Sequence, residues 1–452
     1  MHSDAFIIQY APRLRKLNPF RRLIFARNCR IIETEHMFYW RCAWRSGERY
    51  CTATATIFSR PANASIIRNG KPCRWRWRAI PSGERASSWQ KNELAKHAGV
   101  KTTDTIWQAR EKCPGILFVP PRHHLYSQIS KSINRIYREY TDYVEPASID
   151  ESFLDLSDCL GYYGMSGQEF ADMLRARVRT EIGVTISVGV SFNKTFAKMG
   201  SDYKKPDATT VITEENFRAL LWPLPASDML FVGKSAAVRL ERAGIQTIGD
   251  LANAPAERLR ELLGKGGLHL RDVCNGLDAS PVRLYGDRPE SKSISRGTTF
   301  SHDLTDEAEV LRGVLSLSDA VAAQLRREHL KGSSVQVFLK SPQLKTISRQ
   351  ATLRYATNAH REIESCAMEL IRANWKIGPG APIRAITVGV TRLAPAEEVA
   401  EQISLFDLCE PGEHSLERRE RQEKLESAID QIRQKHGRSA ILRGYSVRDG
   451  KK

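Results

Sequence analysis

Residues 148–153 read Ser-Ile-Asp-Glu-Ser-Phe, and residues 187–194 read Ser-Val-Gly-Val-Ser-Phe-Asn-Lys. The first stretch places two carboxylates, Asp150 and Glu151, side by side in a segment, Tyr143–Leu156, whose pattern is that of extended chain. Adjacent side chains on a regular strand point to opposite faces, so both acids can serve one metal only near a strand end or a bulge. With a third acid from elsewhere they would suit Mg²⁺ that bridges a triphosphate and an attacking hydroxyl. A pair of turn acids is the alternative.

The second stretch begins within Thr185–Ser191, where apolar and small polar residues alternate, and this alternation predicts a half-buried strand. A capped turn follows, and Asn193–Ser201 predicts a helix. Lysines gather near the end of this helix and just beyond it, at positions 198, 204 and 205, and the last of them precedes a proline. A lysine ammonium is a compact point charge that suits phosphate neutralisation. A solvated run of charge is the alternative.

The rest of the chain divides into segments of different composition. At 452 residues it is long enough for about three domains. Helices are expected over residues 91–113, 125–140 and 168–180. Pro223 and Pro225 mark a boundary, after which residues 227–281 are helix and glycine-rich turn.

A polar linker over residues 283–290 separates this helical region from a C-terminal one. Beyond the linker the pattern predicts strand, helix, strand, strand, helix and strand, over residues 292–299, 305–330, 334–339, 345–352, 357–375 and 383–391. The order βαββαβ is that of a ferredoxin-like unit. A polar tail follows Ala394 and ends in a basic helix over Ser415–Lys435.

The two quoted stretches together resemble the Y-family DNA polymerases, the low-fidelity translesion enzymes. The shared motifs are the Ser-Ile-Asp-Glu-Ser acids, the Ser-Val-Gly-x-Ser-x-Asn-Lys block and a Lys-Pro pair at the family's separation. The resemblance implies an α+β fold shaped as a polymerase right hand. Its expected parts are small fingers and palm, helical thumb, linker, ferredoxin-like little finger and tail, over residues 91–222, 223–282, 283–290, 291–394 and 395–452.

The resemblance also implies roles for individual residues. In the family the two adjacent acids bind catalytic Mg²⁺, which implies Asp150 and Glu151 here. The family's lysine before the proline contacts the incoming triphosphate, which implies Lys205. The family's fingers often present Tyr and Arg to the triphosphate. In this chain those places hold Glu93 and Lys96, so only Lys96 can keep the role.

The region after Pro225 is similar to the family's thumb, where a helix-hairpin-helix aims backbone N–H groups at DNA phosphates. The hairpin residues here are Val232, Gly233 and Lys234, and the usual second glycine is expected to be replaced at Lys234 or Ser235. Plain helix packing is the alternative. The ferredoxin-like unit would place two basic residues on the template and primer backbones, namely Lys292 and Arg296.

Residues 402–406, in the polar tail, read Gln-Ile-Ser-Leu-Phe. Two apolar anchors after a Gln and a small polar residue suit insertion into a preformed hydrophobic pocket. The motif resembles the peptide with which bacterial polymerases bind the sliding clamp, which implies the beta clamp of DNA polymerase III as a partner. The residues that would bind it are Gln402, Ser404, Leu405 and Phe406. A chance match of five residues is the alternative.

The net charge of +17 is unevenly distributed along the chain. Residues 1–90 hold 17 Lys and Arg against five acids, or +12, which leaves +5 for residues 91–452. Five of the eight Trp also lie in the first segment, and after Cys73 residues 74–78 alternate Arg and Trp. Three hypotheses compete for this segment: an Arg/Trp arm that binds nucleic acid, an Arg-rich targeting peptide, or a stretch that was never selected as protein.

A family member needs a third catalytic acid from an N-terminal strand, in a pattern like His-x-Asp-x-Asn-x-Phe-Phe-Ala. No such pattern occurs before residue 91, where Asp4 is the single Asp. If the third base of each codon is read with the first two of the next, Tyr50–Arg60 permits Leu-His-Cys-Asp-Cys-Asn-Asn-Phe-Phe-Ala. The frame would switch near Gln90-Lys91-Asn92, whose codons can form a run of A. The hypothesis is that residues 1–90 are an out-of-frame translation of a polymerase gene.

The expected function is template-directed DNA synthesis past lesions in the bacterial cytoplasm, on primer-template DNA with deoxynucleoside triphosphates. Two acids without the third cannot hold both metals, so this chain is expected to be inactive or nearly so. The alternatives are a non-catalytic scaffold bound to clamp and DNA, and an Arg/Trp arm fused to a polymerase body. No apolar run approaches the ~20 residues of a membrane span, so no membrane partner is expected. The nine cysteines lack Cys-x-x-Cys spacing, which favours reduced thiols of the cytosol.

Overall fold

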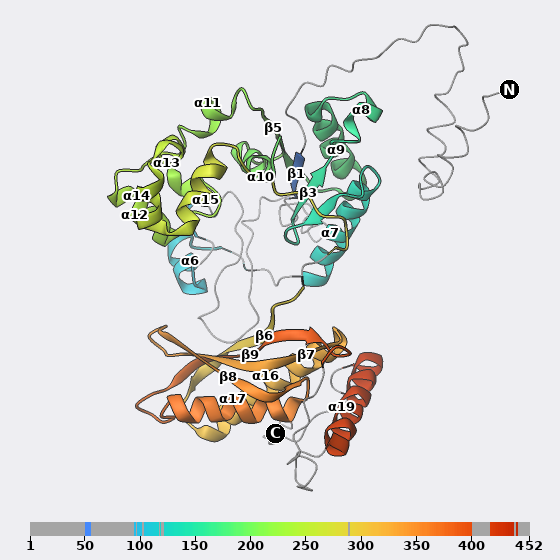
Figure 1. The fold of residues 1–452 in the computed structure, drawn as a ribbon, viewed down its shortest axis with the longest axis vertical. Helices are drawn as coiled ribbons and strands as arrows, with labels where there is room; N and C mark the ends of the chain where they lie inside the picture. The colour runs from blue at the N-terminus through green and yellow to red at the C-terminus, as the bar shows by residue number, and fades with distance from the viewer. Residues whose placement is uncertain are drawn as a thin grey trace, which may run out of the picture. The chain divides into compact units, whose positions relative to one another are not determined.

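The computed structural model describes residues 50–55, 95, 97–101, 104–116, 118, 122–287, 290–399, 416–437 and 440–441. The chain divides into two compact units, one ending at Asp287 and the other starting at Arg288. The division falls within the linker expected over residues 283–290. Each unit combines a β-sheet with helices, which makes the protein α+β, as expected (Figure 1).

The first unit is built on a five-stranded sheet with the order β2-β3-β1-β4-β5. Its strands are β1 Tyr50–Ala55, β2 Val144–Pro146, β3 Glu151–Asp155, β4 Ile186–Ser191 and β5 Thr209–Ile212. β1 pairs antiparallel with both β3 and β4, so a strand from the basic N-terminal segment lies at the centre of the sheet. Its register places Thr54 opposite Glu151 on one side and Ser187 on the other.

Helices cover both faces of this sheet. α7 (His123–Arg138) and α9 (Gly167–Ile182) share a core with the Ile and Val side chains of β4, whereas α10 (Lys194–Tyr203) packs on the opposite face. Every residue of β4 is buried as a result. The expectation of a half-buried strand is therefore wrong. The alternation separates an apolar face from a face of small residues, and each face is covered by a helix.

Two glycines let α10 lie directly against β4. A Cβ atom at Gly189 would lie 1.9 Å from the carbonyl oxygen of Ala197, and one at Gly200 would lie 3.2 Å from the Cα of Gly189. Side chains at these positions would push helix and strand apart. The position of α10 on the sheet is therefore fixed by backbone contact.

Two shorter helices belong to the same unit, α6 (Ile106–Lys112) and α8 (Leu160–Tyr163). α6 begins with a capping box, because Thr105 accepts the N–H of Gln108 at 3.2 Å and the Gln108 side chain accepts the N–H of Thr105 at 2.9 Å. These reciprocal bonds satisfy donors that the first helical turn leaves open. α6 lies within the helical stretch expected over residues 91–113.

The remainder of the first unit is helical, as expected after Pro225. Its elements are α11 Phe217–Leu221, η1 Ala226–Asp228, α12 Lys234–Arg242, α13 Ile248–Asn253, α14 Ala256–Leu263 and α15 Lys265–Cys274. In the turn before α12, Phe231 has φ = 71°, a backbone conformation that favours glycine. The two positions at which the hairpin glycine is expected to be replaced, Lys234 and Ser235, both lie within α12, and that expectation stays a prediction. Lys234 is the first residue of α12 and has an ordinary helical place.

The second unit confirms the expected βαββαβ order. Its elements are β6 Ser293–Leu304, α16 Glu307–Arg327, β7 Leu330–Lys340, β8 Thr346–Thr357, α17 His360–Asn374 and β9 Ile383–Pro395. The strand order is β6-β9-β7-β8 and all neighbours are antiparallel, so β7 and β9 lie at the centre. α16 and α17 lie on one face of this sheet and share one core with it (Figure 1).

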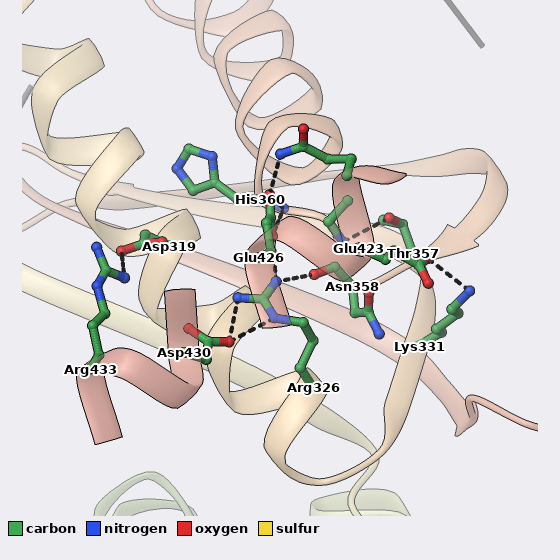
Figure 2. A network of polar contacts seen from close by, with 12 residues as sticks. Asp319, Arg326, Lys331, Thr357, Asn358, His360, Glu423, Glu426, Asp430 and Arg433 are labelled. Carbon is green, nitrogen blue, oxygen red and sulfur yellow. Dashed lines mark hydrogen bonds and ion pairs between the residues drawn. The ribbon is translucent and has the colours of Figure 1, made fainter. Parts of the chain in front are cut away.

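A further helix, α19 (Leu416–His436), joins this unit and corresponds to the helix expected over Ser415–Lys435. It contacts α16, and charged side chains make the connection (Figure 2). Arg326 on α16 donates to Glu426 and, through Nε at 2.7 Å, to Asp430, both on α19. Glu426 is fully buried and also accepts the backbone N–H of His360 at 3.1 Å and the side chain of Gln422 at 2.9 Å.

Two more ion pairs flank the Arg326 cluster (Figure 2). Arg433 of α19 lies 2.7 Å from Asp319 of α16, and Lys331 of β7 lies 2.9 Å from Glu423 of α19. Arg326 itself is only 8% exposed and donates further to the carbonyl oxygen of Asn358 at 2.8 Å. The cluster thus matches its buried charges with opposite charges and hydrogen bonds, which a buried ion pair requires.

Across the described residues, no helix combines the length and the apolar character needed to cross a membrane.

Candidate active site

The paired acids lie where the chain enters β3. Asp150 is the last residue of a tight turn, and Glu151 is the first residue of the strand. The turn is closed by the N–H groups of Ala147 and Ser148, which donate to the carbonyl oxygen of Glu151 at 2.9 and 3.2 Å. Ser148 Oγ also donates to Asp150 Oδ1 at 2.6 Å. Both acids therefore lie at a strand end, the placement that lets adjacent carboxylates serve one site.

Glu151 is the first member of a chain of alternating charges that runs onto α10. Its carboxylate accepts a hydrogen bond from Lys198, which lies 3.0 Å from Asp202, and Asp202 in turn binds Lys205. The side chain of Lys198 is 13% exposed, whereas that of Lys205 is 36% exposed. The chain of charges thus leads from the start of β3, through a nearly buried ammonium, to a lysine in contact with solvent.

The contacts within this chain of charges favour the charged forms of its two middle members, Lys198 and Asp202. Burial opposes charge on Lys198, but the hydrogen bonds to Glu151 and Asp202 outweigh it and raise the pKa of this amine. Burial alone would raise the pKa of Asp202, but the hydrogen bonds from Lys205 and Lys198 outweigh it and hold that pKa below its ordinary value. Lys198 therefore stays an ammonium beside Glu151.

The residues present fit one Mg²⁺ better than two. Mg²⁺ is often bound by one or two carboxylates together with substrate phosphates, and Asp150 and Glu151 can supply those carboxylates. A two-metal site would need a further acid from the neighbouring strand β1, where the residue opposite Glu151 is Thr54. Among the described residues, no group of three or more His, Cys, Asp or Glu could hold a metal ion. Bound Mg²⁺ would neutralise phosphate charge at this strand end.

The Asn-Lys pair of the second sequence motif has structural partners. Asn193 caps α10 by accepting the N–H of Phe196 at 2.7 Å. Lys194 lies 2.8 Å from the buried Glu145, whose carboxylate also accepts Arg283 at 2.8 Å. Burial would raise the pKa of Glu145, but the bonds from Lys194 and Arg283 outweigh it and lower that pKa. Lys194 therefore neutralises a buried acid. The lysines that belong to the chain of charges starting at Glu151 are Lys198 and Lys205.

The loop that carries Lys205 is tied down at one point. Asp207, two residues later, lies 2.9 Å from Arg175 of α9 and also binds Arg179. The bond between Lys205 and Pro206 is cis. Lys205 therefore belongs to a loop whose far end is anchored to α9, while its own ammonium reaches back to Asp202 on α10.

The expected DNA-contacting residues lie in both units. Gly233 is the N-cap of α12, and no side-chain hydrogen bond caps this helix, so its first amides point outward beside Lys234. The N–H of Val232 donates within the turn to Met229 at 3.1 Å. In the other unit Lys292 is exposed just before β6. Arg296 on β6 donates to Gln324 of α16, so its guanidinium is held toward the helical face of the sheet.

Some expected site residues lie outside the described part of the chain. These are Lys96, Gln402, Ser404, Leu405 and Phe406. Conversely, the prediction from sequence missed Lys198 and Asp202 as partners of the acids. Their spacing of four residues, followed by Lys205 three residues later, is the signal that would have found them, because such residues are neighbours on a helix.

Two family models match the chain. The impB/mucB/samB family matches residues 80–202, and the impB/mucB/samB family C-terminal domain matches residues 291–405. The first match contains the paired acids and nearly all of α10, and the second covers the β6–β9 unit. α19 lies beyond the second match.

Curated relatives carry the name DNA polymerase IV. The protein of Acetivibrio thermocellus is 40% identical over 361 residues, which are 79% of this chain and 87% of the relative. That of Clostridium kluyveri is 36% identical over 361 residues, with 80% and 88% of the two chains covered. DNA polymerase IV 1 of Bacillus subtilis is 33% identical over 357 residues, with 78% and 82% covered.

A solved structure shares the fold. A Y-family DNA polymerase chimera matches with a TM-score of 0.64 at 23% identity, over 76% of this chain and 98% of the other. The relatives establish the family, and the structural match agrees with it in fold. The chain belongs to the Y family of DNA polymerases and is similar to the polymerase IV group within it.

Proposed function

We propose that the protein performs template-directed DNA synthesis of the translesion type, with Asp150 and Glu151 as ligands of catalytic Mg²⁺. The observation that carries this assignment is the placement of both acids at the start of β3, directly beside the charge chain of Lys198, Asp202 and Lys205. Phosphoryl transfer needs charge stabilisation and positioning more than covalent chemistry, and this arrangement supplies both.

Lys205 is proposed to contact the incoming deoxynucleoside triphosphate. Its ammonium is partly exposed and its loop is anchored through Asp207, so it can present charge to a phosphate without reorganising the palm. Lys96 is proposed to assist it from the fingers. Both roles rest on the family motif, and the charge chain of the palm supports the first.

Primer-template DNA is the proposed macromolecular substrate. The open N-terminus of α12, with Gly233 and Lys234, suits a DNA phosphate, because helix amides and a lysine both favour anions there. Lys292 and Arg296 are proposed to contact the DNA backbone from the second unit. The tail residues Gln402, Ser404, Leu405 and Phe406 are proposed to bind the DNA polymerase III beta clamp, and the bacterial cytoplasm is the proposed location of the protein.

We further propose that this chain is impaired because β1 brings no carboxylate to the site. In the shifted reading of Tyr50–Arg60, the Asp codon is formed by the last base of codon 53 and the first two bases of codon 54. Thr54 is the β1 residue opposite Glu151. The register therefore supports the view that β1 occupies the place of the catalytic strand while its sequence comes from another frame.

The assignment of the acids is tested by primer extension on an undamaged and a lesion-containing template with Mg²⁺. We expect weak extension from this chain that disappears in the Asp150→Asn and Glu151→Gln variants. Glu181→Gln, an exposed acid on α9, should leave extension unchanged. Extension that survives Asp150→Asn would reject the assignment of the metal ligands.

A non-catalytic scaffold is the second candidate, favoured by the absence of a third acid opposite Glu151. A scaffold should bind primer-template with the same affinity whether Mg²⁺ and a correct nucleotide are present or absent. A polymerase should bind it more tightly in their presence, because the nucleotide pairs with the template. A fluorescence anisotropy titration in both conditions separates the two candidates.

A further inference from the structure

Lys198 lies in a place that none of the expected roles explains. It faces Glu151 across the gap between α10 and β3, and its ammonium also contacts Asp202 one helical turn later. The side chain is nearly buried, so the ammonium has exchanged most of its water for these two carboxylates. A lysine in such a place acts as an internal cation for the acid that it touches.

The place of Lys198 is fixed by the backbone of its helix. Gly189 and Gly200 bring α10 against β4, and neither position has room for a Cβ atom without moving the neighbouring backbone. Asn193 caps the first turn of the same helix. Since α10 cannot slide on the sheet, the ammonium of Lys198 stays within reach of Glu151 whether or not another cation is present.

A divalent cation at Glu151 must therefore share this carboxylate with Lys198. At such separations the interaction between unit charges is large near a protein surface, so a fixed positive charge lowers the affinity of a cation site beside it. Asp202 acts in the opposite sense, because it is a second acceptor for the Lys198 ammonium and shares that charge with Glu151. The balance between these two acids sets how much of the Glu151 carboxylate is open to metal.

We propose that Lys198 is a positioning residue that holds Glu151 in place and competes with the divalent cation for it, with Asp202 as the alternative partner of Lys198. This inference rests on the proposed function in one respect, namely that Glu151 is a metal ligand. It predicts that neutralising Lys198 and neutralising Asp202 change metal affinity in opposite directions.

The test is a titration of the full-length chain with Mn²⁺ alone, with free Mn²⁺ measured by electron paramagnetic resonance. Lys198→Met should bind Mn²⁺ about tenfold more tightly, because a fixed positive charge is removed from the site. Asp202→Asn should bind about threefold more weakly, because Lys198 then pairs with Glu151 alone. Lys198→Arg keeps the cation and should restore affinity to within about twofold of the parent.

Lys204→Met is the matched control. Lys204 is an exposed lysine on the same segment and belongs to none of the described contacts of the Glu151 chain, so its removal should change Mn²⁺ affinity less than about twofold. Circular dichroism of each variant checks that it is folded. If Lys198→Met is unfolded, the comparison of Asp202→Asn with Lys204→Met still decides, because only the former is expected to weaken binding.

Each outcome decides the proposal. Tighter binding in Lys198→Met together with weaker binding in Asp202→Asn supports it. Equal affinities in Lys198→Met and Lys204→Met, or weaker binding in Lys198→Met, would overturn it while the metal site itself stands. If Glu151→Gln binds Mn²⁺ as well as the parent chain does, the proposed metal site has failed, and the role of Lys198 fails with it.

Discussion

The Arg326 network of the second unit and the Lys198 network of the first unit are both alternations of basic and acidic side chains between a helix and its neighbours. In the first of these, Arg326 is 8% exposed and Glu426 is completely buried, so the central ion pair of the network lies within the protein (Figure 2). In the second, the network starts at a strand end and finishes at Lys205, which is in contact with solvent.

The difference between the two networks lies in whether a ligand can enter. The Arg326 network is closed, because it can accept no new charge without losing a buried pair. Its role is therefore to hold α19 on the β6–β9 unit. The Lys198 network is open, because Lys205 and Asp202 keep access to water. It can therefore exchange its outer contacts for contacts with a ligand. Charge alternation alone therefore does not distinguish a structural cluster from a functional one, whereas complete burial of the central ion pair does.

The largest expected effect is in the closed network. Replacing Arg326 by Met leaves the buried Glu426 without its cation, which should cost about 3–5 kcal/mol of unfolding free energy. Urea denaturation of the full chain, with hydrogen exchange on α19, measures the loss and locates it. Arg372→Met is the control, since the Arg372–Glu307 pair is exposed on both sides and should cost less than about 1 kcal/mol. Equal losses of unfolding free energy in the two variants would contradict the distinction between buried and exposed ion pairs.

The next effect concerns the packing on which the open network depends. Gly189→Ala should destabilise the first unit by about 2–3 kcal/mol, because its Cβ would meet the carbonyl of Ala197. Gly266→Ala, in α15, is the matched control, since nothing lies near its added Cβ, and it should not destabilise. Thermal unfolding compares the two variants. If Gly189→Ala is as stable as the parent, α10 is not fixed on β4 as described.

An intermediate case is Glu145, a buried acid with two basic partners. Its folded pKa lies below its unfolded value, so it contributes stability above pH 4.5 that is lost as the pH falls through the folded pKa. Glu145→Gln should lower stability at pH 7 by about 1–3 kcal/mol and flatten the loss of stability on acidification. Denaturation between pH 7 and pH 3 measures both changes. A parent and variant with parallel acid limbs would contradict this assignment, and the exposed Glu181→Gln serves as control.

The smallest expected effect has the opposite sign. Phe231→Gly should stabilise the first unit by about 0.5–1 kcal/mol, because it relieves the left-handed backbone at φ = 71°. The greater conformational entropy that glycine gives the unfolded chain offsets only part of this gain. Val238→Gly, at an exposed site in α12, should instead destabilise by about 0.5–1 kcal/mol. A loss of stability in Phe231→Gly would show that the contact of its ring with His269 outweighs the backbone strain.

The sequence predicted most elements because their patterns are local. The βαββαβ order and α19 follow from periodicity within each segment, and the placement of Asp150 and Glu151 near a strand end follows from their adjacency. The strand order of both sheets depends on contacts between distant segments and could not be predicted. β1 was missed for the same reason, because Tyr50–Ala55 is a short run of mostly small residues whose place is set by β3 and β4.

The same limit explains what was missed at the site. The lysines of α10 look alike in sequence, yet Lys194 neutralises the buried Glu145 and Lys198 neutralises Glu151. Which acid each lysine meets depends on how α10 lies on the sheet, and two glycines fix that position. The helical spacing of Lys198, Asp202 and Lys205 was visible, but it gains meaning only once Glu151 is known to face them.

The most direct test of the account compares this chain with one whose gene has been corrected so that residues 50–60 are read as Leu-His-Cys-Asp-Cys-Asn-Asn-Phe-Phe-Ala. Single-turnover primer extension with Mg²⁺ should be faster in the corrected chain by on the order of 10³-fold, because a third carboxylate then completes the site beside Glu151. Resequencing across codons 85–95 should at the same time reveal the shifted frame. Equal rates in the two chains, or robust extension by the chain as it stands, would contradict the account.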